Sequence, residues 1–429
     1  MQHFTKSPTA STTMMAEEET NTVKRILFVH YGDNWIRGSE RCLLDLMAQL
    51  QQQYFQCVLW CNQSVLAQQA KALGVTVYRS DFPAKLPLFQ RLSKQQSFNV
   101  LVGTGCHIVK KHNIQCIHVN NAAPGQWVSQ VAKQSQLPWL VQLHGIYFWR
   151  DRIYNNLYQA NRLVGVSDYV MRDLKQEQAS PTQKYHVISN GIDTDALPQQ
   201  GQIDLRSQLG ISRQDYVFAH LGSLIKRKGV DTLLWALALR VKQGGAVHLL
   251  IIGSGPEQQS LMQLSRDLGI CAHVSFLGEQ DTAFAILAGT ADCLVSGAKE
   301  EAFGLVAAEA GLAKLPAIVP DIGGLKEVVV DQQTGCHYPV NDSHRLCQLM
   351  AKYQQQPELA KQHGHSGYIR VCHCFNMAQN AAAFARSYQD IASANGSSYW
   401  RNHTALIGTY SLSIFNTLKR KLNKGLAYE

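Results

Sequence analysis

Short runs of apolar residues alternate with helix-like stretches along this chain, and the alternation starts again near residue 217. In the first half the apolar runs cover residues 26–30, 57–60, 75–78, 116–119, 139–143 and 163–166. In the second half they cover residues 217–221, 248–252, 274–277, 292–295 and 317–319. Continuous apolar strands separated by helices are typical of parallel sheets that helices cover on both faces. The sequence therefore predicts an α/β protein of two doubly wound, Rossmann-like domains, with ligands bound at the carboxyl ends of the strands, in the cleft between them.

Length and composition agree with two globular domains. A chain of 429 residues is long for one domain, and a hydrophobic content of 45% is enough to bury sizeable cores. We expect residues 1–22, rich in Ser, Thr and Glu, to be disordered, and a first domain over 23–195. Residues 196–215 have the Gln-, Gly- and Pro-containing composition of a linker, and a second domain follows over 216–374.

The chain is basic, with a net charge of +9. Such an excess suits an anionic partner such as nucleic acid, an acidic membrane surface or a phosphorylated ligand, although ordinary solubility charge explains it equally well. Interleaved basic and aromatic stretches of the nucleic-acid-binding kind are absent from the sequence, so we expect no nucleic-acid partner.

The cysteines and the apolar runs favour a cytoplasmic protein. Eleven cysteines are scattered along the chain, and Cys57, Cys116 and Cys293 lie inside apolar runs, which suits small buried side chains in a reducing compartment. No stretch approaches the roughly 18 apolar residues of a membrane span. Glu17–Glu19 precede any apolar run, unlike in a secretory signal.

Two acidic residues, Glu301 and Glu309, stand eight positions apart around Gly304, where an apolar run typical of a helix begins. A helix rises about 1.5 Å per residue, so the spacing puts the two carboxylates roughly 12 Å apart. Acids at that distance share neither a proton nor a metal, but they can hold the two ends of one elongated polar ligand. The free N–H groups near Gly304 would then face phosphates between them. A helix with solvated acids at both ends is the alternative.

The residues around this pair resemble the donor loop of the retaining family 4 glycosyltransferases, which have the GT-B fold. Matching segments follow in the family's order over roughly residues 24–390: 38–41 (GSER), 144–145 (HG), 190–193 (NGID), 222–224 (GSL), 228–229 (KG), 253–256 (GSGP), 276–278 (FLG), 296–305 (SGAKEEAFGL), 323–327 (GGLKE) and 334–335 (TG). This chain departs from the family at Ser39 and Ala302, where Gly is usual, and at Ser223, where Arg is usual. In the family the segment after the second domain crosses back to the first, which implies a crossing helix over 375–395.

For the donor, a nucleotide sugar, the resemblance implies a phosphate site in the second domain. Gly222 and Ser223 belong to the segment that contacts the diphosphate, and Lys228 supplies a compact positive charge. The family's Arg would make a bidentate phosphate contact that Ser223 lacks, and Arg227 is the candidate to compensate for it.

The Glu pair takes the two ends of the same donor. Glu309 would accept hydrogen bonds from the ribose hydroxyls, since a carboxylate offers two acceptor oxygens to a vicinal diol. Glu301, favoured over its neighbour Glu300 because it stands two residues before Phe303, would face the transferred sugar and stabilise positive charge at the anomeric carbon. The other implied donor-binding residues are Phe303, Gly304 and Leu305, the last two through N–H groups at a helix N-terminus.

The first domain contributes the other side of the cleft. His144 follows the apolar run 139–143, so it points into the cleft, and in the family this His lies near the transferred sugar; a core histidine bonded to the backbone is the alternative. Gly38 and Ser39 resemble the Gly-rich loop at the cleft edge, and Ser39 also suits the N-cap of the next helix. Acceptor recognition is expected mostly in loops of this domain, such as 32–38 and 103–111.

Together these segments predict a retaining glycosyltransferase that moves a sugar from a nucleotide-sugar donor to a saccharide or lipid-linked saccharide acceptor, in surface polysaccharide or lipopolysaccharide synthesis. No residue stands out as a covalent nucleophile, so front-face substitution, in which the leaving phosphate takes the acceptor's proton, fits best. No Asp-x-Asp motif lies at a matching strand end, so we expect no cofactor and no essential divalent metal. A nucleotide-sugar 2-epimerase of the same architecture and a non-catalytic nucleotide-sugar-binding protein are the alternatives.

The tail over residues 396–429 lies outside the resemblance. On a helix, one apolar stripe would be formed by Ile407, Tyr410, Ile414, Leu418, Leu422 and Leu426, with cations beside it. A basic amphipathic helix over 400–426 suits an anionic membrane surface and would place the protein on the inner membrane face. Docking of the stripe on the protein's own first domain is the alternative.

Overall fold

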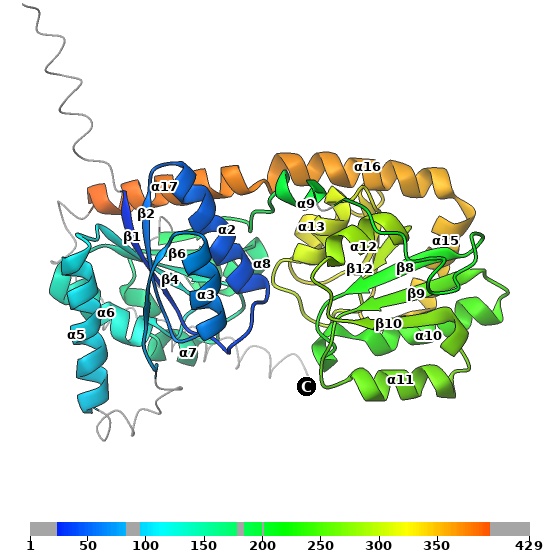
Figure 1. Cartoon of the computed structure of the whole chain (residues 1–429), viewed down its shortest axis with the longest axis horizontal. Coiled ribbons are helices and arrows are strands. Elements are labelled where there is room, and N and C mark those ends of the chain that lie inside the picture. The colour runs from blue at the N-terminus through cyan, green and yellow to red at the C-terminus, as the bar shows by residue number, and fades with distance from the viewer. Residues whose placement is uncertain (1–23, 83–94, 178–183, 200, 395–429) are drawn as a thin grey trace, which may run out of the picture.

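The structure is a computed structural model, and it describes residues 24–82, 95–177, 184–199 and 201–394. These residues form two α/β lobes, each built around one parallel sheet, and two long helices run along both lobes (Figure 1). The predicted fold class, two Rossmann-like domains, is confirmed.

The first lobe contains a seven-stranded sheet in the order β3-β2-β1-β4-β5-β6-β7. Its strands are β1 (Arg25–His30), β2 (Gln56–Cys61), β3 (Thr76–Arg79), β4 (Cys116–Asn120), β5 (Trp139–Leu143), β6 (Arg162–Gly165) and β7 (Tyr185–Val187). Its helices are α2 (Gly38–Gln52), α3 (Ser64–Ala72), α5 (Gln95–Lys111), α6 (Gly125–Ser135), α7 (Trp149–Tyr154), the 3-10 turn η2 (Leu157–Gln159) and α8 (Asp168–Glu177). Strands β4 and β5 are buried at every residue, as both faces of the sheet are covered.

The second lobe contains a six-stranded sheet in the order β10-β9-β8-β11-β12-β13. Its strands are β8 (Tyr216–Leu221), β9 (Val247–Ile252), β10 (Val274–Gly278), β11 (Cys293–Val295), β12 (Ala317–Pro320) and β13 (Gly335–Tyr338). Its helices are η4 (Lys226–Lys228), α10 (Val230–Lys242), α11 (Gln258–Asp267), η5 (Cys271–His273), α12 (Ala283–Thr290), α13 (Leu305–Leu312), α14 (Leu325–Val328), α15 (Ser343–Gln355) and α16 (Pro357–Cys374). The sequence did not predict the last strand of either sheet, β7 or β13.

The final helix returns to the first lobe. Helix α16 lies along the second lobe and α17 (Met377–Ala394) along the first (Figure 1). Phe384 and Tyr388 of α17 are fully buried and share a core with Phe28 of β1. The Tyr388 hydroxyl also lies 2.8 Å from Nδ1 of His118 in β4. Helix α17 is therefore part of the first lobe's core, although it is the last helix of the described residues.

Hydrogen bonds at the end of β6 join the two lobes. The backbone N–H groups of Asp168 and Tyr169, at the start of α8, donate to the two carboxylate oxygens of Glu327 in α14, at 2.9 and 2.8 Å. The hydroxyl of Ser167 donates to the carbonyl oxygen of Ala302 at 2.6 Å. A carboxylate at a helix N-terminus satisfies N–H groups that have no partner inside the helix. Glu327 thus caps a helix of the other lobe.

One predicted acceptor loop is wrong. Residues 103–111 lie in α5, and the glycines there do not mark a turn. A Cβ on Gly105 would lie 2.6 Å from Val131 in α6 and 3.0 Å from Trp60 in β2. The missing side chain lets α5 pack closely on its neighbours.

The segment predicted as a linker is partly structured. It begins with the short helix α9 (Ala196–Gln199), and Ile203 then bonds to α12, where its N–H donates to the carbonyl oxygen of Ala285 at 2.9 Å. The predicted disordered segment, 1–22, and the predicted tail, 396–429, lie outside the described residues. Within the described part of the chain, none of the helices is long and apolar enough to span a membrane.

Replacing Phe384 with Ala should destabilise the first lobe. The change removes a fully buried ring and leaves a cavity between α17 and β1, so we expect the free energy of unfolding to fall by about 3–5 kcal/mol. Urea denaturation followed by the fluorescence of the buried tryptophans of this lobe (Trp60, Trp127 and Trp139) measures it. Arg386→Ala, exposed on the same helix, should change it by about 0.5 kcal/mol or less. Equal stability of Phe384→Ala and the unmodified chain would show that α17 is not part of this core.

Candidate functional site

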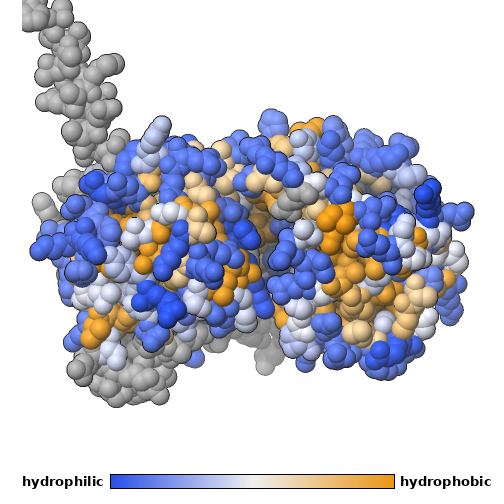
Figure 2. Space-filling model, viewed as in Figure 1, coloured by the Kyte–Doolittle hydropathy of each residue, from blue (hydrophilic) through white to orange (hydrophobic). Residues whose placement is uncertain are grey.

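The carboxyl ends of both sheets face one cleft between the lobes, which Figure 2 shows as a groove. The strand order reverses between β1 and β4 in the first sheet and between β8 and β11 in the second, and doubly wound folds bind ligands at such points. The cleft has a volume of about 690 Å³. All the predicted site residues except Glu309 line it: Gly38, Ser39, His144, Gly222, Ser223, Arg227, Lys228, Glu301, Phe303, Gly304 and Leu305.

Lys228 and Glu301, predicted for the diphosphate and the sugar of the donor, contact each other. Nζ of Lys228 lies 2.5 Å from Oε2 of Glu301, and the two side chains are 18% and 17% exposed. At this burial each charge needs a partner, because the loss of one would leave the other buried and unpaired. An anionic ligand that reached Lys228 would compete directly with Glu301 for its charge.

The loops that carry Lys228 and Glu301 are packed backbone to backbone. Gly229 has a φ of +58°, and a Cβ at this position would lie 1.9 Å from the carbonyl oxygen of Gly297. Only glycine fits there. The N–H of Lys299 donates to the carbonyl oxygen of Arg227 at 2.8 Å, which joins the same two loops. This contact sets the distance between the lysine and the carboxylate.

Helix α13 begins after Glu301, and the predicted spacing of the Glu pair along one helix is therefore wrong. The helix covers Leu305–Leu312 with Gly304 as its N-cap, at a φ of +104°. Glu301 lies in the loop before it, and only Glu309 is helical. Phe303, which is 3% exposed, anchors this loop by packing edge-on against Phe375, with 5.4 Å between ring centroids.

Two helix N-termini meet at the cleft, one from each lobe. Helix α2 begins at Gly38, and a Cβ on Gly38 would lie 3.0 Å from the side chain of Leu305, the first residue of α13. The positive ends of both helix dipoles and their free N–H groups therefore lie together. The predicted N-cap of α2, Ser39, is wrong, because the cap is Arg37 and Ser39 stands within the first turn.

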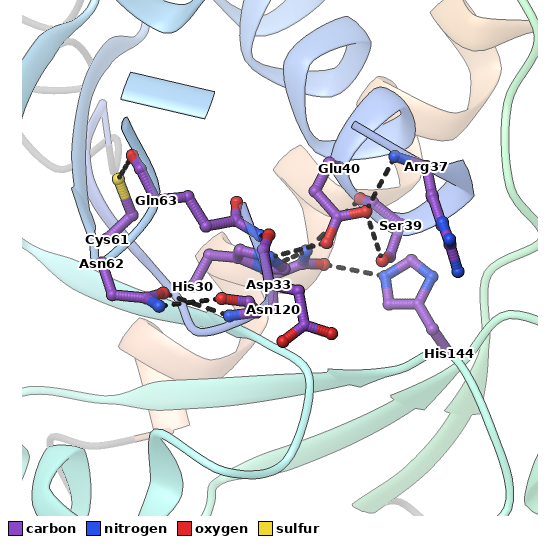
Figure 3. A network of polar contacts seen from close by, with 11 residues as sticks. His30, Asp33, Arg37, Ser39, Glu40, Cys61, Asn62, Gln63, Asn120 and His144 are labelled. Atoms are coloured by element: carbon purple, nitrogen blue, oxygen red, sulfur yellow. Dashed lines mark hydrogen bonds and ion pairs between the residues drawn. The ribbon is translucent and has the colours of Figure 1, made fainter. Parts of the chain in front are cut away.

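A chain of polar contacts connects α2 to His144 across three strands (Figure 3). Oε1 of Glu40 lies 3.0 Å from Nε2 of His30, at the end of β1. Nδ1 of His30 lies 2.9 Å from Nδ2 of Asn120, at the end of β4. Oδ1 of Asn120 lies 2.7 Å from Nε2 of His144, which follows β5. The backbone N–H of Arg37 and the hydroxyl of Ser39 also donate to Oε2 of Glu40, both at 3.1 Å.

The charge states along this chain are set by burial and by its hydrogen bonds. Burial raises the pKa of Glu40, but the hydrogen bonds from His30 and from the backbone outweigh it and lower that pKa to about 2. Glu40 is therefore a carboxylate. Burial and the nearby His30 lower the pKa of His144 to about 3, against the opposing effect of Glu40. His144 is a neutral imidazole at neutral pH.

Glu309 does not line the cleft but faces α2 from the side of α13. Burial is the main cause that raises the pKa of Glu309 to about 7; Arg41 opposes this and Asp45 adds to it. Burial also raises the pKa of Asp45 to about 6. Two carboxyl groups from different lobes thus share the field of Arg41, and Glu309 is close to half-protonated at neutral pH.

Sequence reasoning missed His30, Glu40 and Asn120. His30 and Asn120 end β1 and β4, the two strands at which the order of the sheet reverses, and this position was the signal that could have found them. Polar and charged residues that line the cleft and were not predicted as site residues include Asn190, His220, Ser254, Glu279 and Ser296. The guanidinium of Arg37 stacks on the ring of Trp35 at 4.0 Å, and both lie in the predicted acceptor loop 32–38.

Comparisons with known proteins agree with this architecture. Residues 36–196 match the model of "Glycosyltransferase Family 4", and residues 202–370 match that of "Glycosyl transferases group 1". An N-acetyl-alpha-D-glucosaminyl L-malate synthase of Bacillus anthracis is 26% identical over 295 residues, which cover 66% of this chain and 77% of the relative. A putative glycosyltransferase of Bacillus subtilis, EpsD, is 22% identical over 326 residues, 71% of this chain and 81% of the relative.

Among solved structures, Anabaena HepE in complex with UDP-glucose is similar with a TM-score of 0.72. It is 20% identical, and the match covers 85% of this chain and 99% of HepE. At this identity the likeness shows only that the two proteins share the GT-B fold.

Glu309→Gln should stabilise the protein at alkaline pH. The folded state holds the proton of Glu309 up to about pH 7, whereas an unfolded chain releases it near 4.5, so the group's contribution to stability falls as the pH rises between these values. By pH 8 the folded state carries a charge that glutamine lacks, and the variant should unfold with a free energy about 1–3 kcal/mol higher. Thermal unfolding at pH 5 and 8 measures this, with the largely exposed Glu358→Gln as the control. A difference that does not grow with pH would contradict the assignment.

Proposed function

Because this chain belongs to the family 4 glycosyltransferases, which have the GT-B fold, we propose that it moves a sugar from a nucleotide-sugar donor to a saccharide or lipid-linked saccharide acceptor, with retention of the anomeric configuration. The observation that carries the proposal is the Lys228–Glu301 pair beside the two helix N-termini. Helix N-termini and lysine side chains bind phosphate groups. A carboxylate beside them, such as that of Glu301, can accept hydrogen bonds from the hydroxyls of a sugar.

Donor binding would rearrange this pair. The diphosphate replaces Glu301 as the ionic partner of Lys228. Arg227, on the same turn, lines the cleft beside it. Glu301 is then released toward the sugar, where a carboxylate accepts hydrogen bonds from hydroxyls and stabilises positive charge as the anomeric carbon loses its leaving group. We propose that the ribose hydroxyls bind the carboxyl of Glu309, which faces α2 from α13.

The bond changes we propose are those of a front-face substitution. The bond between the anomeric carbon and the β-phosphate oxygen breaks, the acceptor hydroxyl oxygen bonds to that carbon on the same face, and the departing phosphate takes the hydroxyl proton. Lys228, Arg227 and the helix N-termini stabilise the negative charge of the leaving diphosphate. We propose that these groups suffice for the step without a divalent metal.

Incubation of the full chain with labelled nucleotide sugars tests the proposal, beginning with UDP-glucose. Slow release of free nucleotide diphosphate without an acceptor, unchanged by EDTA, is the expected result. Inversion at C2 of the sugar would instead identify an epimerase, and tight binding without turnover would identify a binding protein.

Substitutions of the ion pair should separate binding from chemistry. Lys228→Ala should weaken donor binding by about 1–3 kcal/mol, because a charge-assisted phosphate contact is lost. Glu301→Ala should lower kcat more than it raises KM, because its contact strengthens as charge develops. Lys226→Ala, an exposed lysine of the same turn that does not line the cleft, is the matched control. Wild-type kinetics of both site variants in folded protein would refute the donor-site assignment.

We also propose that the product enters surface polysaccharide or lipopolysaccharide, because the basic apolar tail would hold the enzyme at the inner membrane face, where lipid-linked saccharides occur. Deletion of residues 396–429 should abolish co-sedimentation with anionic vesicles, and neutral vesicles should not sediment the full chain. If the truncated chain still binds as well, or the full chain never binds, the membrane role of the tail is refuted.

A further inference from the structure

In the hydrogen bonds that connect His144 to Glu40, each residue donates toward Glu40. A backbone carbonyl group fixes this direction. Nδ2 of Asn120 lies 3.4 Å from the carbonyl oxygen of Ser39, and a carbonyl oxygen only accepts hydrogen bonds. The amide of Asn120 therefore turns its nitrogen toward Ser39 and His30 and its oxygen toward His144. If the amide of Asn120 were flipped, its oxygen would lie against the carbonyl oxygen of Ser39, and two acceptors would face each other.

This direction assigns the protons on both histidines. Asn120 donates to Nδ1 of His30, so the proton of His30 is on Nε2 and is donated to the carboxylate of Glu40. Oδ1 of Asn120 accepts a hydrogen bond, so the proton of His144 is on its own Nε2. Each donor in the chain meets an acceptor, and the buried negative charge of Glu40 stands at the accepting end.

His144 is left with one unprotonated nitrogen, Nδ1, and this residue lines the cleft. An unprotonated imidazole nitrogen only accepts hydrogen bonds. Glu40 from α2 and His30 from β1 influence the pKa of this ring, and Arg37, the N-cap of α2, lines the same cleft. A ligand group beside Nδ1 must therefore donate.

We propose that Glu40 is a positioning residue that acts through His30 and Asn120 to hold His144 in the Nε2–H tautomer, so that the sugar bound at His144 is a neutral one that donates a hydroxyl to Nδ1, and not a uronate. A uronate would set its carboxylate against the Nδ1 lone pair, so that two acceptors would face each other with no proton between them. The sugar specificity rests on the proposed donor site, whereas the tautomer does not.

Nitrogen NMR of the full chain labelled with ¹⁵N-histidine tests the tautomer without a substrate. Loss of signals in His144→Gln assigns His144, and the expected spectrum shows protonated Nε2 and unprotonated Nδ1 from pH 5.5 to 8. Protonated Nδ1, or titration of the ring in this range, would overturn the proposal.

Glu40→Gln tests the origin of the tautomer. The N–H of Arg37 needs the glutamine oxygen, so the glutamine amide nitrogen turns to Nε2 of His30, and the chain no longer has a single direction. The two His144 nitrogen signals should then move toward each other, and Glu40→Asp should restore them. A His144 spectrum unchanged in Glu40→Gln would overturn the role of Glu40, since a purely structural role predicts that result. Glu358→Gln, far out on α16, is the charge-matched control.

Binding of UDP-glucose and UDP-glucuronate to the unmodified chain tests the specificity. We expect about tenfold or greater preference for UDP-glucose, and a smaller ratio in Glu40→Gln. Equal affinity, or preference for the uronate, would overturn the specificity. If neither compound binds, the chain does not take uridine diphosphate sugars, and the NMR result alone decides whether Glu40 positions His144.

Discussion

The parallel direction of the strands in both sheets is the constraint on which the site depends. Every strand in such a sheet ends at the same edge, and every return helix begins there, so the loops and the positive helix ends collect at one side of each lobe. Because the lobes face each other with these edges, residues that follow β5 and β6 line the same cleft as residues of β8 and β11. The first turns of α2 and α13, separated by more than half the chain, come into van der Waals range.

The cleft and the helices that border it carry charged groups that are only partly paired with one another. Lys228 is neutralised by Glu301, Glu40 is stabilised by donors from His30, Arg37 and Ser39, and Glu309 holds its proton up to about pH 7 because burial makes its charge costly. The first of these arrangements is an exchangeable contact, the second a fixed one, and the third a group that a polar ligand would ionise. Carboxyl groups with shifted pKa values at one edge, here Glu40 and Glu309, are typical of a binding site rather than of a structural core.

The sequence predicted the repeated α/β pattern because both sheets are buried on two faces, which makes their central strands continuous apolar runs. It missed β7, Tyr185–Val187, because a three-residue edge strand has too few apolar positions to stand out. It misread the glycines of 103–111 as a loop signal, although Gly105 serves close packing of α5. Lys228, Glu301 and His144 were found because they lie in recognisable segments. The chain from Glu40 to His144 was not found, because its members come from four elements and meet only through the strand order of the sheet.

Glu327 gives the two lobes a shared point of attachment. Its carboxylate holds the first turn of α8 in the other lobe, and the junction of α16 and α17 ties the lobes covalently at a second place. The chain between β7 and β8 crosses between the lobes at a third place, and Ser167 bonds Ala302 close to Glu327. Any opening of the cleft therefore has to pivot about these hydrogen bonds or break them.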